Sequence, residues 1–176
     1  MNLHVVAYPE LSTTDRELIQ AVRKDHNTLY NVIKPHFTIV FSVPHMSSLD
    51  FIAEIKKQIG NTGIIPVTIR CAIINKDSFS DYFDAFLVPD EGFSQVLGLH
   101  DKLYSGLLAR YHRVDISYIP HMSIANSKDV YAIKKIADEW NKKNLVIQGT
   151  ISSLDIINYE NRTITTIEKI QLHRLY

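Results

Sequence analysis

Two short apolar stretches of the sequence share the same arrangement of a histidine and a hydroxyl residue. Residues 35–41 are Pro-His-Phe-Thr-Ile-Val-Phe, and residues 119–125 are Ile-Pro-His-Met-Ser-Ile-Ala. Each run predicts a strand, and side chains at positions i and i+2 of a strand lie on the same face, roughly 6 to 7 Å apart. We therefore expect each strand to present one imidazole and one hydroxyl on a polar face and to bury its other, apolar face.

The tripeptide His-x-Ser/Thr alone is a weak signal, because it occurs four times in a chain with eight histidines. The copy at residues 45–47 precedes apolar residues at helical spacing, which favours Ser47 or Ser48 as a helix N-cap. The copy at residues 26–28 lies in a polar run that is typical of a helix end. Only the two stretches described first place the tripeptide inside an apolar run.

This pair of motifs resembles the 2H phosphoesterase superfamily, which includes the 2′-5′ RNA ligase-like proteins and the 2′,3′-cyclic nucleotide phosphodiesterases. The superfamily is named for two His-x-Thr/Ser motifs set between apolar residues. In this sequence the matching pairs are His36 with Thr38 and His121 with Ser123. The resemblance implies a bilobal fold in which the two motifs face each other across a cleft.

The rest of the chain repeats one order of elements. Five alternating strands and helices are followed by five more in the same order, at an offset of 80 to 85 positions. The two histidine strands occupy the same place in each half. The expected strands are residues 3–8, 35–43, 64–74, 82–88, 119–125, 145–157 and 163–173. The expected helices are residues 14–25, 48–59, 92–109 and a segment from Ser127 to about Trp140.

This order predicts an α+β fold built from duplicated βαβαβ units with one closing strand. We expect a single bilobal domain over residues 1–176, with halves of about 1–78 and 79–176. In the superfamily fold, two antiparallel-rich sheets face a central cleft and the helices lie on the outside. The two histidines would then meet at the cleft.

Charge and composition limit the partners. Lys plus Arg equals Asp plus Glu, with 19 of each, so no global positive field attracts long nucleic acid or an anionic membrane. No apolar run reaches the ~18 residues of a membrane span, and the first residues lack the features of a signal peptide. We expect a cytoplasmic monomer with no obligate protein partner. The single cysteine, Cys71, is expected to be a structural thiol.

Two histidines facing one phosphate supply general acid-base chemistry. With an unperturbed pKa near 6.5, one imidazole can be neutral and the other protonated close to neutral pH. We expect His121 as the base and His36 as the acid, although the sequence does not distinguish these roles. Thr38 and Ser123 would donate hydrogen bonds to the phosphate oxygens. This chemistry requires no metal and no other cofactor.

The expected substrate is a nucleotide or RNA end that carries a cyclic or 2′-5′ phosphodiester. Superfamily members that act on RNA ends often have a basic residue soon after the second motif, whereas here Lys128 falls at an expected helix start. Ligase activity is therefore less expected than hydrolysis. The alternative is a non-catalytic RNA- or nucleotide-binding module of the same fold.

A zinc site is the competing hypothesis for the histidine pair. Such a site needs three or four ligands, and no further ligand stands at a regular spacing from His36 or His121. The other histidines without a companion motif are expected at the surface or at the edge of the core. They are His4, His100, His112 and His173.

Overall fold

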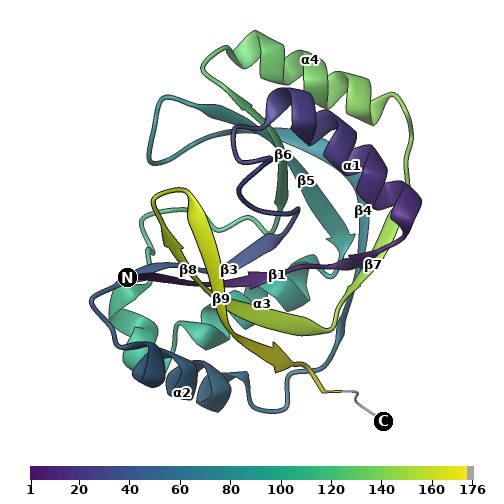
Figure 1. Ribbon diagram of the computed structural model, residues 1–176. Helices are drawn as coiled ribbons and strands as arrows, with labels where there is room; N and C mark the ends of the chain where they lie inside the picture. Colours follow the sequence, from purple (N-terminus) through teal and green to yellow (C-terminus); the bar gives the residue numbers. More distant parts are fainter. Residues whose placement is uncertain (174–176) are drawn as a thin grey trace.

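The computed structural model describes residues 1–173 and contains two antiparallel sheets, which confirms the α+β prediction (Figure 1). The four-stranded sheet has the order β3-β1-β8-β9, and the five-stranded sheet has the order β2-β7-β4-β5-β6. The strands of the first sheet are β1 (Asn2–Ala7), β3 (Phe37–Pro44), β8 (Ser153–Glu160) and β9 (Thr163–Gln171). Those of the second sheet are β2 (Glu10–Leu11), β4 (Ile65–Lys76), β5 (Phe83–Glu91), β6 (Met122–Ser127) and β7 (Ile147–Ile151).

The helices lie on the outer faces of the two sheets (Figure 1). Helices α1 (Thr13–His26) and α4 (Val130–Asn141) pack on the five-stranded sheet, where α1 contacts β6 and α4 contacts β4, β5 and β6. Helices α2 (Ser48–Ile59) and α3 (Phe93–Leu103) pack together beside the four-stranded sheet, and the 3₁₀ helix η1 (Gly106–Tyr111) follows α3. Within residues 1–173, no helix has the length and hydropathy that crossing a bilayer requires.

The helix starts follow from capping residues. Ser47 caps α2, as the sequence predicts, and its Oγ accepts a hydrogen bond of 3.1 Å from the backbone N–H of Asp50. The predicted start of α1 at residue 14 is one residue late, because Ser12 caps that helix. Ser127 does not cap α4, because it still belongs to β6, and Asp129 takes that place.

Two predicted elements are each divided in the structure. The segment 145–157 is not one strand, since β7 belongs to the five-stranded sheet and β8 to the four-stranded sheet. The segment 92–109 is not one helix, since α3 ends at Leu103. Gly106 begins η1 with a φ of 60°, and an added Cβ at this position would collide with the carboxylate of Glu54.

Strand pairing shows how the two halves are related. Strand β3 pairs with β1, with Thr38 opposite Val6, and β6 pairs with β5, with Ser123 opposite Phe86. Strands are exchanged between the halves, because β4 of the first half pairs with β5, and β8 of the second half pairs with β1. Each sheet therefore draws strands from both halves, and the division of one domain at about residue 78 remains a prediction.

Candidate active site

A cavity of about 670 Å³ lies between the ends of the two histidine strands. Its lining includes His36 and Thr38 from the four-stranded side, and His121 and Ser123 from the five-stranded side. The β4–β5 connection and the segment 115–119 form other parts of the wall. The structure thus brings all four predicted site residues to one cavity, although they come from stretches 85 positions apart.

The two histidines are held by the same local geometry. Each stands one residue before its strand and directly after a buried proline, Pro35 or Pro120. The Nδ1–H of His36 donates to the carbonyl oxygen two residues earlier at 2.8 Å, and that of His121 does so at 2.6 Å. A carbonyl can only accept, so Nδ1 carries the proton and Nε2 keeps its lone pair. Nε2 is therefore the nitrogen that is free to accept a proton.

Both rings are half-buried, and burial lowers the pKa of His36 and of His121 to about 4. The hydrogen bonds to backbone carbonyls oppose this shift only in part, and the positive charge of Arg23 lowers the pKa of His36 further. His121 also stacks on Phe86, with ring centroids 3.5 Å apart. These pKa shifts favour the neutral form of both imidazoles at pH 7 in the free protein, whereas the unperturbed pKa used in the sequence analysis would allow one protonated ring.

Ser123 is positioned by a residue to which the sequence pattern assigns no role. Asn27 is 8 % exposed at the end of α1, and its Nδ2 donates to the carbonyl oxygen and Oγ of Ser123 at 3.2 and 3.4 Å. Asn126 makes a second link, because its side chain hydrogen-bonds the backbone N–H and Oγ1 of Thr28, both at 3.1 Å. An asparagine at a helix end is the local signal for such a cap, but its partner on β6 lies too far along the chain to be inferred.

Two backbone groups at the edge of β3 form hydrogen bonds with tyrosine side chains from the second half of the chain. The hydroxyl of Tyr118 donates to the carbonyl oxygen of Thr38 at 2.9 Å. The hydroxyl of Tyr104 accepts a hydrogen bond of 2.8 Å from the backbone N–H of Phe41. These contacts fix the backbone beside Thr38, and Tyr118 also lines the cavity.

The cavity wall is acidic. Among the described residues that line it, Asp77, Asp84 and Asp115 are charged and none is lysine or arginine. Asp115 is neutralised by Arg113, whose guanidinium donates two hydrogen bonds of 2.8 and 2.7 Å to it. Burial raises the pKa of Asp84 to about 6, and the negative charge of Asp77 adds to this shift. The histidines are the only basic side chains among the described lining residues, and Lys128 and Arg162 lie just behind the wall, against Tyr82 and Thr28.

A smaller cavity of about 160 Å³ adjoins the main one. The two share Leu29, His36 and Thr38, and the rest of the smaller wall is mainly apolar. An apolar recess beside a polar one suits a ligand with one flat, weakly polar part and one charged part.

The two motifs and the paired sheets define a 2H-type phosphoesterase fold, and the chain belongs to the 2′-5′ RNA ligase superfamily, whose family model matches residues 9–163. The chain is also 25% identical, over 162 residues, to a Bacillus licheniformis protein that is provisionally named a phosphoesterase. That match covers 91% of this chain and 85% of the relative.

Solved structures share the fold at low sequence identity. TT0787 of Thermus thermophilus has a TM-score of 0.63 and 13% identity, with all of both chains covered. LigT of Escherichia coli, in complex with 3′-AMP, has a TM-score of 0.58 and 14% identity, with 98% of each chain covered. Usb1 of Kluyveromyces marxianus has a TM-score of 0.53 and 9% identity, with 94% of this chain and 97% of the other covered.

Proposed function

We propose that this protein is a hydrolase of cyclic or 2′-5′ phosphodiesters on a nucleotide or RNA end, and that it uses two histidines as general acid and base. The observation that carries the proposal is the pair His36 and His121, held in the same tautomer by the same backbone contact at one cavity. In-line displacement at phosphorus needs a proton acceptor on one side and a proton donor on the other. Two imidazoles from different sheets meet this need without a metal in the reaction.

In the proposed reaction on a 2′,3′-cyclic phosphate, one imidazole takes a proton from water as the water oxygen attacks phosphorus. The other imidazole gives a proton to the ribose oxygen as its bond to phosphorus breaks, which leaves a phosphomonoester. We assign His121 to the first role and His36 to the second. The hydroxyls of Thr38 and Ser123 donate to the non-bridging oxygens.

The negative charge of the substrate can raise the pKa of the imidazole that acts as the acid. Because both imidazoles are neutral at pH 7, one must gain a proton before it can act as the acid. A bound phosphodiester places a negative charge beside the rings, and an opposite charge within a few ångströms raises the pKa of a histidine. Substrate binding and protonation of the histidine that acts as the acid are therefore coupled.

The charge of the wall favours a small substrate. Binding of long nucleic acid depends on lysine and arginine contacts to many phosphates, and the described lining contains neither residue. The main cavity and its apolar neighbour, of about 670 and 160 Å³, offer separate room for a sugar phosphate and a base. We therefore place mononucleotides and the terminal nucleotide of an RNA ahead of internal RNA sites, and hydrolysis ahead of ligation.

A non-catalytic nucleotide-binding module of the same fold is the second candidate. It is favoured by the neutral state of both imidazoles in the free protein, which suits ligand binding without proton transfer. In that case the loss of either histidine would change affinity little and no substrate would be turned over.

The test is a turnover screen with 2′,3′-cyclic mononucleotides, 2′-5′-linked oligonucleotides and ADP-ribose cyclic phosphate. On the true substrate, His36→Ala and His121→Ala should each lower kcat by about 10²- to 10⁴-fold, as expected for loss of a general acid or base. His45→Asn is a matched control, because His45 lies in the same Pro-His-Met-Ser sequence as His121 but is exposed outside the cavity. This control should keep full activity.

The same screen separates the two candidates. Binding of a nucleotide by the wild-type protein without turnover of any substrate would support the binding module. A single histidine variant with near wild-type turnover would remove that histidine from the mechanism.

A further inference from the structure

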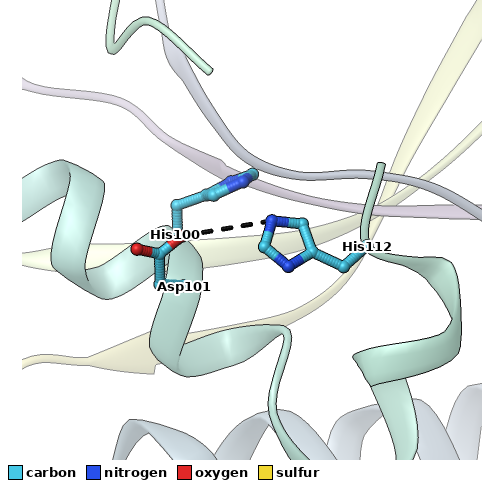
Figure 2. A group of neighbouring side chains, drawn as sticks. All are labelled: His100, Asp101 and His112. Atoms are coloured by element: carbon cyan, nitrogen blue, oxygen red, sulfur yellow. Dashed lines mark ion pairs between the residues drawn. The ribbon is translucent and has the colours of Figure 1, made fainter. Parts of the chain in front are cut away.

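A second group of histidine and carboxylate side chains lies outside the candidate active site. His100 and Asp101 stand near the end of α3, and His112 is the C-cap of η1 (Figure 2). One potential ligand atom from each of the three lies within 4.8 Å of the other two. None of them lines either of the two cavities that contain His36.

His100 is buried, and one of its ring nitrogens is held by a backbone carbonyl. The residue is 2 % exposed, so it is buried rather than at the surface or core edge as expected from the sequence. Its Nδ1–H donates to the carbonyl oxygen of Ile39 on β3 at 2.8 Å, and its ring stacks on Tyr118 at 3.6 Å between centroids. Metal-binding histidines commonly donate one ring nitrogen to a carbonyl in this way, which leaves the other nitrogen as the ligand.

The other two members of the group are less buried than His100. The Asp101 side chain is 61% exposed, and that of His112 is 28% exposed. His112 Nε2 and Asp101 Oδ1 are 4.0 Å apart, the ion pair that is dashed in Figure 2. An exposed pair at this distance is not hydrogen-bonded and contributes little to stability. Asp101 is therefore free to turn toward a metal, whereas the His112 ring also stacks on Tyr104, with centroids 4.7 Å apart, and would have to shift along that ring.

We propose that His100, Asp101 and His112 form a binding site for one divalent transition metal ion, with zinc as the best match. Two imidazoles and one carboxylate are a common zinc donor set. Zinc ligands at 2.0 to 2.2 Å in a tetrahedron lie about 3.4 Å from one another, so Asp101 and His112 need to move inward by only about an ångström. Water would occupy the fourth position.

The ion would have a structural role. It would join α3 to η1, and through the hydrogen bond from His100 to Ile39 it would also tie both to β3. Strand β3 begins directly after His36, but Tyr118 and Phe41 separate the proposed metal site from the main cavity. The bound ion would therefore stabilise the wall of the cavity without touching the substrate.

The test is thermal unfolding of the full chain after treatment with a chelator, titrated with zinc chloride. The ion binds only the folded state, so at a hundred times its Kd we expect Tm to rise by about 5 to 10 °C. Dialysis against zinc should leave one ion per chain. Asp101→Asn replaces an exposed side chain, and His112→Gln a partly exposed one, so both should fold without metal, but the zinc-dependent rise in Tm should be largely lost in both. The control His45→Asn should keep it.

The histidines of the cavity provide the deciding comparison. His36→Ala and His121→Ala should keep the full zinc-dependent rise in Tm. Loss of the rise in either variant would mean that zinc binds between these histidines and would overturn the proposal. An absent rise in the wild-type protein, or an equal rise in Asp101→Asn and His112→Gln, would also overturn it. None of these results depends on turnover of a phosphodiester.

Discussion

The surroundings of His36 and His121 orient the two rings and also lower their pKa. Each Nδ1 is tied to a carbonyl only two residues away, which directs the ring without the help of a carboxylate. Burial then lowers the pKa of both to about 4. A carboxylate partner would have raised the pKa instead. In the proposed mechanism, the negative charge of the substrate would therefore have to promote protonation of the acid.

The first prediction concerns the pH dependence of turnover. kcat/KM reports the free enzyme and kcat reports the enzyme-substrate complex. Above about pH 5 the singly protonated free enzyme becomes rarer, so we expect kcat/KM to fall by about tenfold per pH unit toward pH 8. The alkaline limb of kcat should lie at higher pH, because the bound phosphate raises the pKa of the acid. Steady-state kinetics at constant ionic strength measure both, and coincident profiles would contradict this coupling.

Asp84 gives a second prediction at the level of a single side chain. Its pKa of about 6 makes it negative above that pH, where it repels a phosphate in the same cavity. Asp84→Asn should therefore lower KM by about three- to tenfold at pH 8 and by much less at pH 5, where the carboxyl is already neutral. Asp81→Asn is the control, because Asp81 lies three residues earlier, on the β4–β5 connection, and outside the described lining. A KM that changes equally at both pH values would argue against a charge effect.

At the scale of elements, the turn before each histidine strand sets the ring position. Proline fixes φ near −65° and so limits the conformations of the short turn that brings each Nδ1–H to its acceptor. Pro35→Ala and Pro120→Ala should lower kcat by about tenfold with a smaller change in KM, because the rings would be less well oriented. Pro44→Ala, at the other end of β3, should leave kcat unchanged. Unchanged kcat in the first two variants would show that strand packing alone orients the rings.

The sequence predicts those parts of the fold and site that depend on local pattern. The strand predicted at residues 35–43 is found at 37–44, and of the two predicted caps, Ser47 and Ser48, the structure uses Ser47, because both features depend on residues close in the chain. The break between β7 and β8 was missed, since residues 145–157 are continuously compatible with a strand and only long-range pairing divides them. The contact from Asn27 to Ser123 spans 96 positions and has no local signature. The repeated tripeptide therefore predicted which residues line the cavity, whereas the contacts that support them have no local pattern.

At the scale of the whole molecule, the exchanged strands make the halves interdependent. Without the second half, β1 loses β8, and without the first half, β5 loses β4. We expect fragments 1–78 and 79–176 to be unfolded when separate and to regain circular dichroism and turnover when mixed in equal amounts. Either fragment folding alone with a cooperative transition would contradict the exchange as a requirement for stability.

The exchanged strands also explain how the two copies of the His-x-Ser/Thr motif can have different surroundings. If one half existed as a separate polypeptide, it could complete its sheet only by exchanging a strand with a second, identical copy. The two copies would then be related by symmetry, and both imidazoles would have the same surroundings. Joining the two units in one polypeptide removes that restriction. One ring now stacks on Phe86 while the other lies beside Tyr8 and Arg23. Covalent linkage thus gives two equivalent histidines different surroundings, which the proposed acid and base roles require.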